Sequence, residues 1–304
     1  MLTRYPRFLR ALAFPLLVLV LDLAVVEALS QVAALLTTQL FGANGPAFQD
    51  VAYYSKVLFV IPVLLLGARL FEKRSFAEVG FAPRHIWQNI LLGLTISATV
   101  MSLTALILAL AGWYHVQSVP ADISGIVVTL LSGLLLYCVI AIQEEVIFRG
   151  ILFRLLERGL GSWVALGISA LTFGWFHIAN PGASWISSLA IALEAGITLA
   201  AAYMLTRNLW LCIGLHWGWN FFEGTVFGFN VSGNSSPVLV QSYTTGPSLW
   251  TGGQFGPEAG LVTVTLSIVL FSVLLYLAAK RGRICAPAFL AYIHGGRATN
   301  KLTM

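Results

Sequence analysis

Two adjacent glutamates end a long run of residues without charge, and an arginine follows them (AIQEEVIFRG, 141–150). On a helix, side chains four residues apart share a face, so we expect Glu145 and Arg149 to form a structural ion pair. Glu144 is turned by about 100° from that face and is left without this partner. A free carboxylate in an apolar surrounding suits a general base, which takes a proton from water.

Two histidines and an asparagine add polar groups to other apolar runs. His216 and Asn220 are four residues apart and therefore share one helix face. Two hydrogen-bond donors on one face of a cavity are suited to stabilising an oxyanion. His177 lies in a separate apolar run, so three different elements must position these groups.

The composition indicates that these elements are membrane helices. Hydrophobic residues make up 58% of the 304 residues and charged residues only 10%, which is far from the composition of soluble domains. Several charge-free runs reach the roughly 18–20 residues that cross hydrocarbon as a helix. We therefore predict an all-α, polytopic membrane helix bundle of about eight transmembrane helices. The predicted spans are 11–40, 50–70, 88–113, 123–157, 162–179, 184–206, 208–229 and 260–280.

The basic residues predict the orientation of the bundle. Lys and Arg gather before the first span, between the second and third, at the end of the fourth, between the sixth and seventh, and after the eighth. The intervening loops have none, which predicts cytoplasmic N and C termini. The dispersed charge argues against nucleic acid as a partner, and the three cysteines show no spacing typical of disulfides or zinc. We interpret the opening as a retained span rather than a signal peptide.

Three regions follow from this order. Residues 1–119 form N-terminal membrane spans with an interfacial segment near 75–88, and residues 120–230 form a core that holds the polar groups. Residues 231–304 form an external loop, the last span and a cytoplasmic tail.

Helix geometry predicts that the polar groups meet. Measured from cytoplasmic ends near 158, 162 and 208, Glu144 and His177 lie roughly 21–22 Å deep, Asn220 roughly 18 Å and His216 roughly 12 Å. Ionisable groups at such depth mark function or specific helix pairing. Each residue taken singly fits helix pairing, but their convergence favours one buried site.

Other ionisable residues in the apolar runs have no assigned role. Glu223, three residues after Asn220, is placed to share its face, to pair with Lys56, or to serve packing. Lys56 itself is unexplained within a predicted span. Asp22, Glu27 and Glu194 rank lower as site residues.

Three motifs of this sequence resemble those of the CPBP family, the CAAX protease and bacteriocin-processing intramembrane peptidases. EEVIFR (144–149) resembles EExxxR, FGWFH (173–177) resembles FxxxH, and HWGWN (216–220) resembles HxxxN, in the same order along the chain. The resemblance implies an intramembrane endopeptidase in which Glu144 and His177 activate water and His216 and Asn220 stabilise the oxyanion. It makes Phe173 a packing residue.

The cofactor is left open by the resemblance. The family is often called a metalloprotease, and Glu144, His177 and His216 would be the ligands of zinc or another divalent metal. A metal-free mechanism is equally compatible with the same residues, and the chain has no HExxH helix.

Two other functions compete with proteolysis. One is a non-enzymatic membrane scaffold or bacteriocin-immunity partner with the same fold, and the other is a proton-coupled transporter, which the absence of internal repeats disfavours. As a protease, the chain would act on a membrane-associated protein or peptide in the lipid bilayer, and we expect the plasma membrane of a bacterium. The sequence leaves the substrate and the oligomeric state open.

Overall fold

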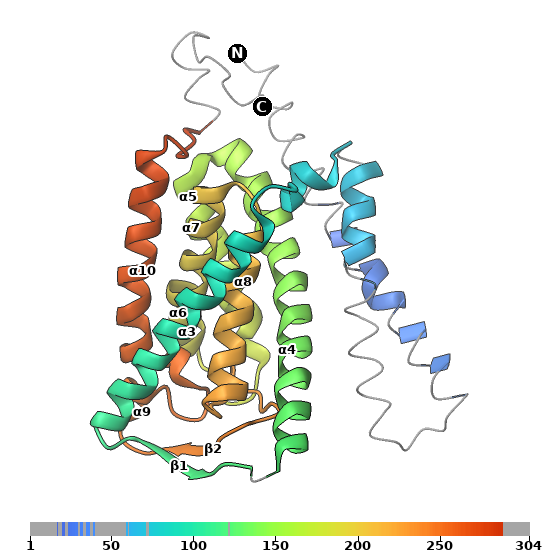
Figure 1. Ribbon diagram of the computed structural model, residues 1–304. Coiled ribbons are helices and arrows are strands. Elements are labelled where there is room, and N and C mark those ends of the chain that lie inside the picture. Colours follow the sequence, from blue (N-terminus) through green and yellow to red (C-terminus); the bar gives the residue numbers. More distant parts are fainter. Residues whose placement is uncertain are drawn as a thin grey trace.

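The protein is a helical bundle (Figure 1). The computed structural model describes residues 73–120 and 122–287, a helix over Ile61–Leu70, and scattered positions between 17 and 59. Within these residues, four helical stretches are long and apolar enough to cross a membrane: Ala77–Leu110, Ile123–Ala179, Trp185–Thr206 and Leu261–Lys280. A polytopic helical membrane protein is therefore confirmed, while the total of eight spans and the cytoplasmic termini stay predictions.

The long helices are interrupted by short π-helical segments. The α-helices that build the bundle are α3 (Ile86–Leu110), α4 (Ile123–Glu145), α5 (Arg154–Phe176), α6 (Trp185–Ile191), α7 (Ile197–Thr206), α8 (Trp210–Asn220) and α10 (Leu261–Lys280). The π-helical segments are η1 (Ala77–Phe81), η2 (Val146–Phe153), η4 (Ala192–Gly196) and η5 (Phe221–Val226). Single turns of 3₁₀-helix follow α5 (η3, His177–Ala179) and precede α10 (η6, Pro257–Ala259).

The predicted spans agree in part with these bounds. The predicted span 11–40 lies about half outside the described residues, and in the span 50–70 the described part contains the helix Ile61–Leu70. The predicted break between 157 and 162 corresponds to a kink at Gly161, whose φ of 78° is left-handed. A side chain there would also meet the backbone nitrogen of Pro287 at 2.7 Å, so glycine is needed for both reasons.

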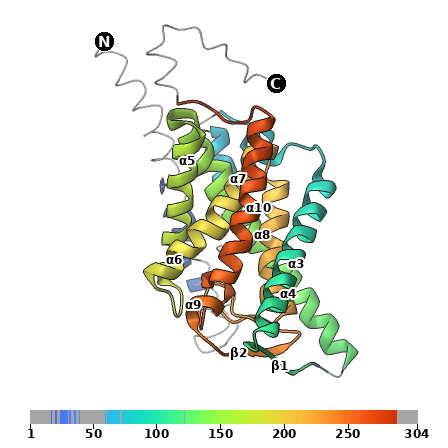
Figure 2. The same cartoon turned by 90° about the vertical axis from the view of Figure 1, so that its left-hand side faces the viewer.

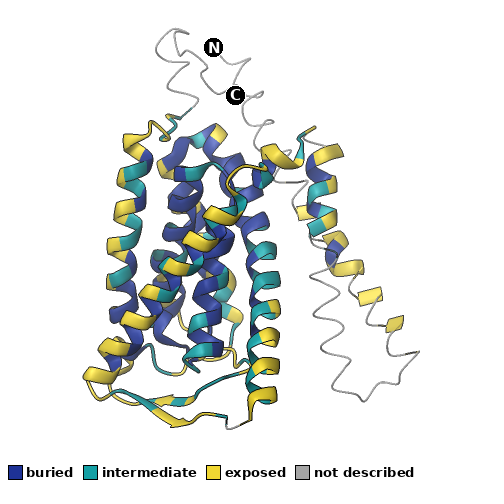
Figure 3. Ribbon diagram, in the orientation of Figure 1, coloured by how far each residue is buried: buried dark blue, intermediate teal, exposed yellow. Residues whose placement is uncertain are grey.

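Helices α7 and α8 lie inside the bundle, and α10 lies on an outer face of it (Figures 2 and 3). The most apolar part of Trp185–Thr206 is 72% buried, against 28% for Leu261–Lys280. Glycines allow α8 to pack closely on α3: a side chain on Gly93 would overlap the backbone of Gly214 and Leu215, and one on Gly214 would overlap that of Ile90. Close approach of this kind is typical of helices in membranes.

The loop predicted over 231–260 contains ordered structure that the sequence did not predict. Strand β2 (Gln241–Thr244) pairs antiparallel with β1 (Tyr114–Ser118), which follows α3, and the pair closes one end of the bundle (Figure 1). A short helix, α9 (Ser248–Thr251), follows β2. The purely α-helical prediction is thus corrected by one small sheet, whose strands are too far apart in sequence to be read as a hairpin.

Candidate active site

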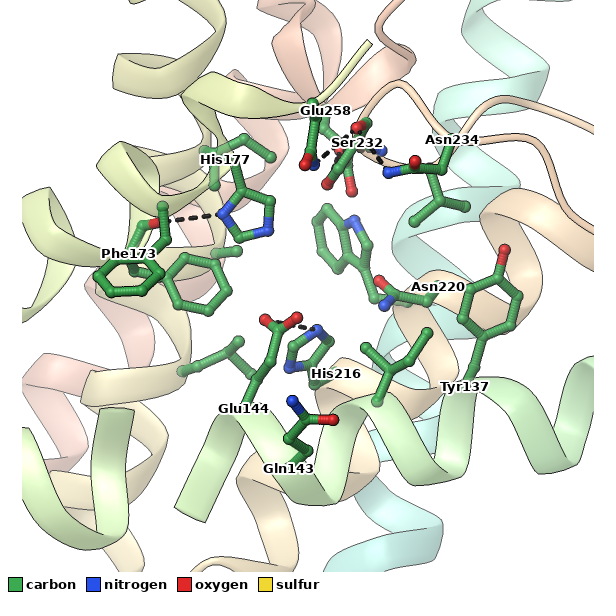
Figure 4. Close-up of a pocket in the computed structure, with 18 of the residues that line it drawn as sticks. Tyr137, Gln143, Glu144, Phe173, His177, His216, Asn220, Ser232, Asn234 and Glu258 are labelled. Carbon is green, nitrogen blue, oxygen red and sulfur yellow. Dashed lines mark hydrogen bonds and ion pairs between the residues drawn. The ribbon is translucent and has the colours of Figure 1, made fainter. Parts of the chain in front are cut away.

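A cavity of about 900 Å³ lies inside the bundle, and all four predicted catalytic residues line it. Glu144 comes from the end of α4, His177 from the turn after α5, and His216 and Asn220 from α8 (Figure 4). The predicted convergence of three helices on one place is therefore present in the structure. The catalytic roles of these residues stay a prediction.

The two histidines stand at different distances from Glu144. Its Oε2 atom is 3.9 Å from His216 Nε2, whereas Glu144 and His177 do not approach within 4 Å and face each other across the cavity (Figure 4). The side chain of Glu144 is 24% exposed, and its Oε2 has no hydrogen-bond partner among the described residues. Its carboxylate is therefore available to a small molecule in the cavity.

The predicted ion pair between Glu145 and Arg149 is present, and it extends to a third residue. Arg149 Nη1 donates to Glu145 Oε1 over 2.7 Å, and both side chains are fully buried. The same oxygen lies 2.8 Å from His216 Nδ1. Because an ionised carboxylate only accepts hydrogen bonds, His216 must carry a proton on Nδ1. In neutral His216 the Nε2 atom therefore has a lone pair, and it becomes a donor only when the ring is protonated.

Arg149, on η2, also bonds to the segment between α6 and α7. Its Nη2 atom donates to the carbonyl oxygens of Ala195 and Gly196, each over 3.2 Å. A π-helical turn leaves carbonyls without their usual α-helical partners, and Arg149 supplies the missing donor for η4. The guanidinium carbon lies 4.5 Å from the ring centre of Phe173, which adds a cation–π contact.

His177 is held by the helix that precedes it. Its Nδ1 atom is 2.8 Å from the carbonyl oxygen of Phe173, which only accepts, so Nδ1 carries the proton. The neutral ring then presents the lone pair of Nε2 for taking up a proton. The Phe173 ring lies 4.8 Å from the His177 ring and 6.0 Å from the His216 ring, centre to centre. Phe173 is thus packed between the two histidines, in keeping with the packing role that the resemblance implies.

Asn220 and Glu223 separate because the helix changes its winding. Asn220 is 6% exposed, lines the cavity, and makes no side-chain hydrogen bond to the described residues, so its amide faces the cavity. Segment η5 begins at Phe221, and Glu223 lies behind the cavity wall against Glu258. Of the three alternatives left open for Glu223, a place on the cavity-lining face of Asn220 is therefore not the one observed. Lys56, its other predicted partner, lies outside the described residues.

The side chains of the cavity do not fit the predicted metal site. In the described part of the chain, no three His, Cys, Asp or Glu side chains stand together in a way that would hold one metal ion. The Nδ1 atoms of His177 and His216 are bonded to Phe173 and Glu145, which leaves Nε2 of each ring for any ligand. The alternative with Glu144, His177 and His216 as ligands, and with it the term metalloprotease, is therefore not supported.

The sequence missed several residues that line the cavity. Glu258 lies in the turn before α10, outside every predicted span, and its Oε2 accepts from the backbone N–H and the hydroxyl of Ser232, each over 2.9 Å. Burial raises the pKa of the Glu258 carboxyl, and the bonds from Ser232 oppose that rise. Glu27 and Glu194, both ranked low, also line the cavity. The only sequence signal of Glu27 and Glu194 is a charge within a predicted span. Glu258 lies outside the predicted spans and therefore lacks this signal.

The central region of the chain matches one known family. Residues 126–222 match the family model described as Type II CAAX prenyl endopeptidase Rce1-like. No curated protein and no solved structure matches the chain. The matched residues include Glu144, His177, His216 and Asn220, together with Glu145 and Arg149. The match supports the resemblance of this region to the CPBP/CAAX intramembrane proteases, which the three motifs indicated.

Proposed function

We propose that the protein is an intramembrane endopeptidase that hydrolyses a peptide bond of a membrane-associated protein or peptide. The observation that carries the proposal is the placement of Glu144, His177, His216 and Asn220, from three different elements, around one cavity in an apolar bundle. Water is scarce in hydrocarbon, so an enzyme that hydrolyses bonds there needs a polar cavity walled by helices. This cavity meets that requirement.

Glu144 and His177 are the groups that would activate water. A water molecule between them would lose a proton to the Glu144 carboxylate as its oxygen attacks the carbonyl carbon of the substrate. His177 would orient the same water by accepting a hydrogen bond at Nε2. The proton on Glu144 would then pass to the nitrogen of the departing amine as the C–N bond breaks, which leaves a carboxylic acid and an amine.

Asn220 and His216 are the groups that would stabilise the oxyanion. The Asn220 amide would donate directly to the oxygen that becomes negative. His216 would donate from Nε2 only as an imidazolium, because its Nδ1 proton is bound to Glu145. Glu145 favours that charged ring, while Arg149 balances the charge of Glu145. Glu145 and Arg149 would therefore act as structural support for His216.

The site of action would be the cell membrane of a bacterium, with both termini in the cytoplasm. Support comes from the alternation of basic residues between successive loops and from the four apolar helices.

The test compares protein N-termini in membranes that contain the wild type or Glu144→Gln. We expect termini that depend on the wild type to fall by about 10²–10⁴-fold in the variant, which is the usual effect of losing a general base. Glu78→Gln makes the same chemical change at an exposed position outside the cavity and should keep every terminus. Equal termini in wild type and Glu144→Gln, at equal protein levels, would refute proteolysis and favour a scaffold or immunity partner.

A further inference from the structure

One end of the active-site cavity is acidic, and the proposed chemistry does not use it. Glu194 on η4 and Glu258 on η6 line this end, and Glu223 lies directly behind Glu258; we call these three residues the acidic end. All three side chains are at most 3% exposed. In the described part of the chain, no lysine or arginine forms an ion pair with any of them.

Unpartnered polar atoms mark the same end of the cavity. Both carboxylate oxygens of Glu194 are buried without a hydrogen-bond partner, and so are Thr198 Oγ1 and Trp219 Nε1, among the described residues. Glu194, Thr198 and Trp219 are 1%, 2% and 6% exposed, and all three line the cavity. Leaving a buried polar group unpaired costs about 1–3 kcal/mol, so such groups indicate a place that a ligand completes.

The charge of the cavity lining indicates which kind of ligand this is. Four glutamates line the cavity, Glu27, Glu144, Glu194 and Glu258, whereas none of its described lining residues is Lys or Arg. A low-dielectric cavity with charges of one sign attracts the opposite charge strongly. A compact metal ion is disfavoured, because the described carboxylates do not gather around one point. An ammonium or guanidinium group on a flexible chain does not need that convergence.

The acidic end also lies close to the groups proposed for hydrolysis. Figure 4 shows the side chains of His177 and Glu258 at the same part of the cavity. A side chain bound there would belong to a residue near the scissile bond. The indole ring of Trp219 adds a surface on which a guanidinium or ammonium group can stack.

We propose that the acidic end is a subsite for a basic side chain of the substrate, a lysine or arginine at a fixed position near the cleaved bond. This inference rests on the proposed function and adds the substrate class. Glu194 and Glu258 would supply the negative charge, Thr198 a hydroxyl acceptor, and Glu223 would hold Glu258 from behind.

The experiment uses the purified full-length protein in lipid vesicles and a peptide library of random sequence. We expect the cleaved peptides to be enriched in Lys or Arg at one position relative to the cut. Two peptides that differ only by Lys or norleucine at that position then give a ratio of kcat/KM. Because losing one partner of a buried charge pair costs about 2–5 kcal/mol, the ratio should fall by about 30-fold or more in Glu194→Gln.

Two further variants separate the explanations. Glu258→Gln should lower the same ratio and covers the case in which Glu194→Gln does not fold, as judged by thermal unfolding. Glu78→Gln, the matched control, should leave the ratio unchanged. Glu144-dependent cleavage without a preference for Lys or Arg, or a preference that both variants keep, would overturn the subsite and leave the proposed function standing. The absence of any Glu144-dependent cleavage would overturn both.

Discussion

Buried charges are arranged in opposite ways in two regions next to the cavity. On the first, which we call the paired side, Glu145 is matched by Arg149 and His216 over 2.7 and 2.8 Å, and the spare donor of Arg149 is bound by backbone carbonyls. At the acidic end, Glu194, Glu223 and Glu258 face one another, and no cation is bound to them in the described residues. Paired buried charges hold their side chains in place, whereas a buried carboxylate without a cation is costly unless a cation binds to it. The difference separates residues that shape the site from residues that select what enters it.

Breaking the paired side should have the largest effect. Arg149→Met leaves Glu145 buried without a cation, so we expect the free energy of unfolding to fall by about 3–5 kcal/mol in denaturant titrations of the purified protein. Arg74→Met is the matched control, because Arg74 and Glu78 form the same four-residue pair at 2.6 Å but are exposed. That variant should lose less than about 1 kcal/mol.

A double substitution sharpens the same test. Arg149→Met with Glu145→Gln removes both charges and should recover part of the lost stability. If the free energy of unfolding of Arg149→Met equals that of the wild type, the paired side does not stabilise the fold as we describe.

Changing the spacing across the cavity should have the next largest effect. A side chain on Gly174 would overlap the carbonyl of Ser188 and lie 2.9 Å from the Cβ of Ala192, so Gly174→Ala must push α5 from α6 and displace His177. We expect kcat/KM to fall by about 100-fold, as small displacements of catalytic groups do. Gly167→Ala on the same helix meets nothing within 4 Å and should keep full activity. Full activity of Gly174→Ala would show that the position of His177 is not critical.

Removing one carboxylate from the acidic end should have the smallest effect on stability. Because the pKa of Glu258 is raised on folding, the folded chain holds this proton to a higher pH than the unfolded chain does. Stability is therefore complete below the ordinary glutamate pKa, falls as pH rises above it, and stops falling beyond the raised pKa. Glu258→Gln removes this loss and should raise Tm by about 2 °C at neutral pH, equivalent to about 1 kcal/mol.

The measurement is a series of melting curves from acid to neutral pH. The difference in Tm between Glu258→Gln and the wild type should widen as pH rises. A difference in Tm that is constant with pH, or that shrinks as pH rises, would contradict the raised pKa of Glu258.

The parts that the sequence predicted well depend on local spacing and on hydropathy. Glu145 and Arg149 pair as helix spacing requires, and His216 and Asn220 line one cavity because they lie within the single α-helical run of α8. The kink at Gly161 follows from a glycine between two apolar runs. Each of these features needs only residues that are neighbours in the chain.

The parts that the sequence missed depend on changes of winding and on distant contacts. Segment η5 turns Glu223 away from the face of Asn220, and a period of 3.6 residues cannot show this. Glu258 reaches the cavity through a turn whose place is fixed by Ser232, 26 residues earlier. The bond of His216 to Glu145 joins residues 71 positions apart and sets the tautomer of the ring. No local pattern predicts these contacts.

The glycine contact between α3 and α8 has a mechanical consequence. Backbone meets backbone at Gly93 and Gly214, and the hydroxyl of Ser97 donates to the carbonyl of Leu215 over 2.6 Å. We expect two helices in such close contact to move together as one rigid unit. His216 and Asn220 belong to this unit. Any movement that widens the cavity must therefore lie in its other walls, while His216 and Asn220 keep their positions.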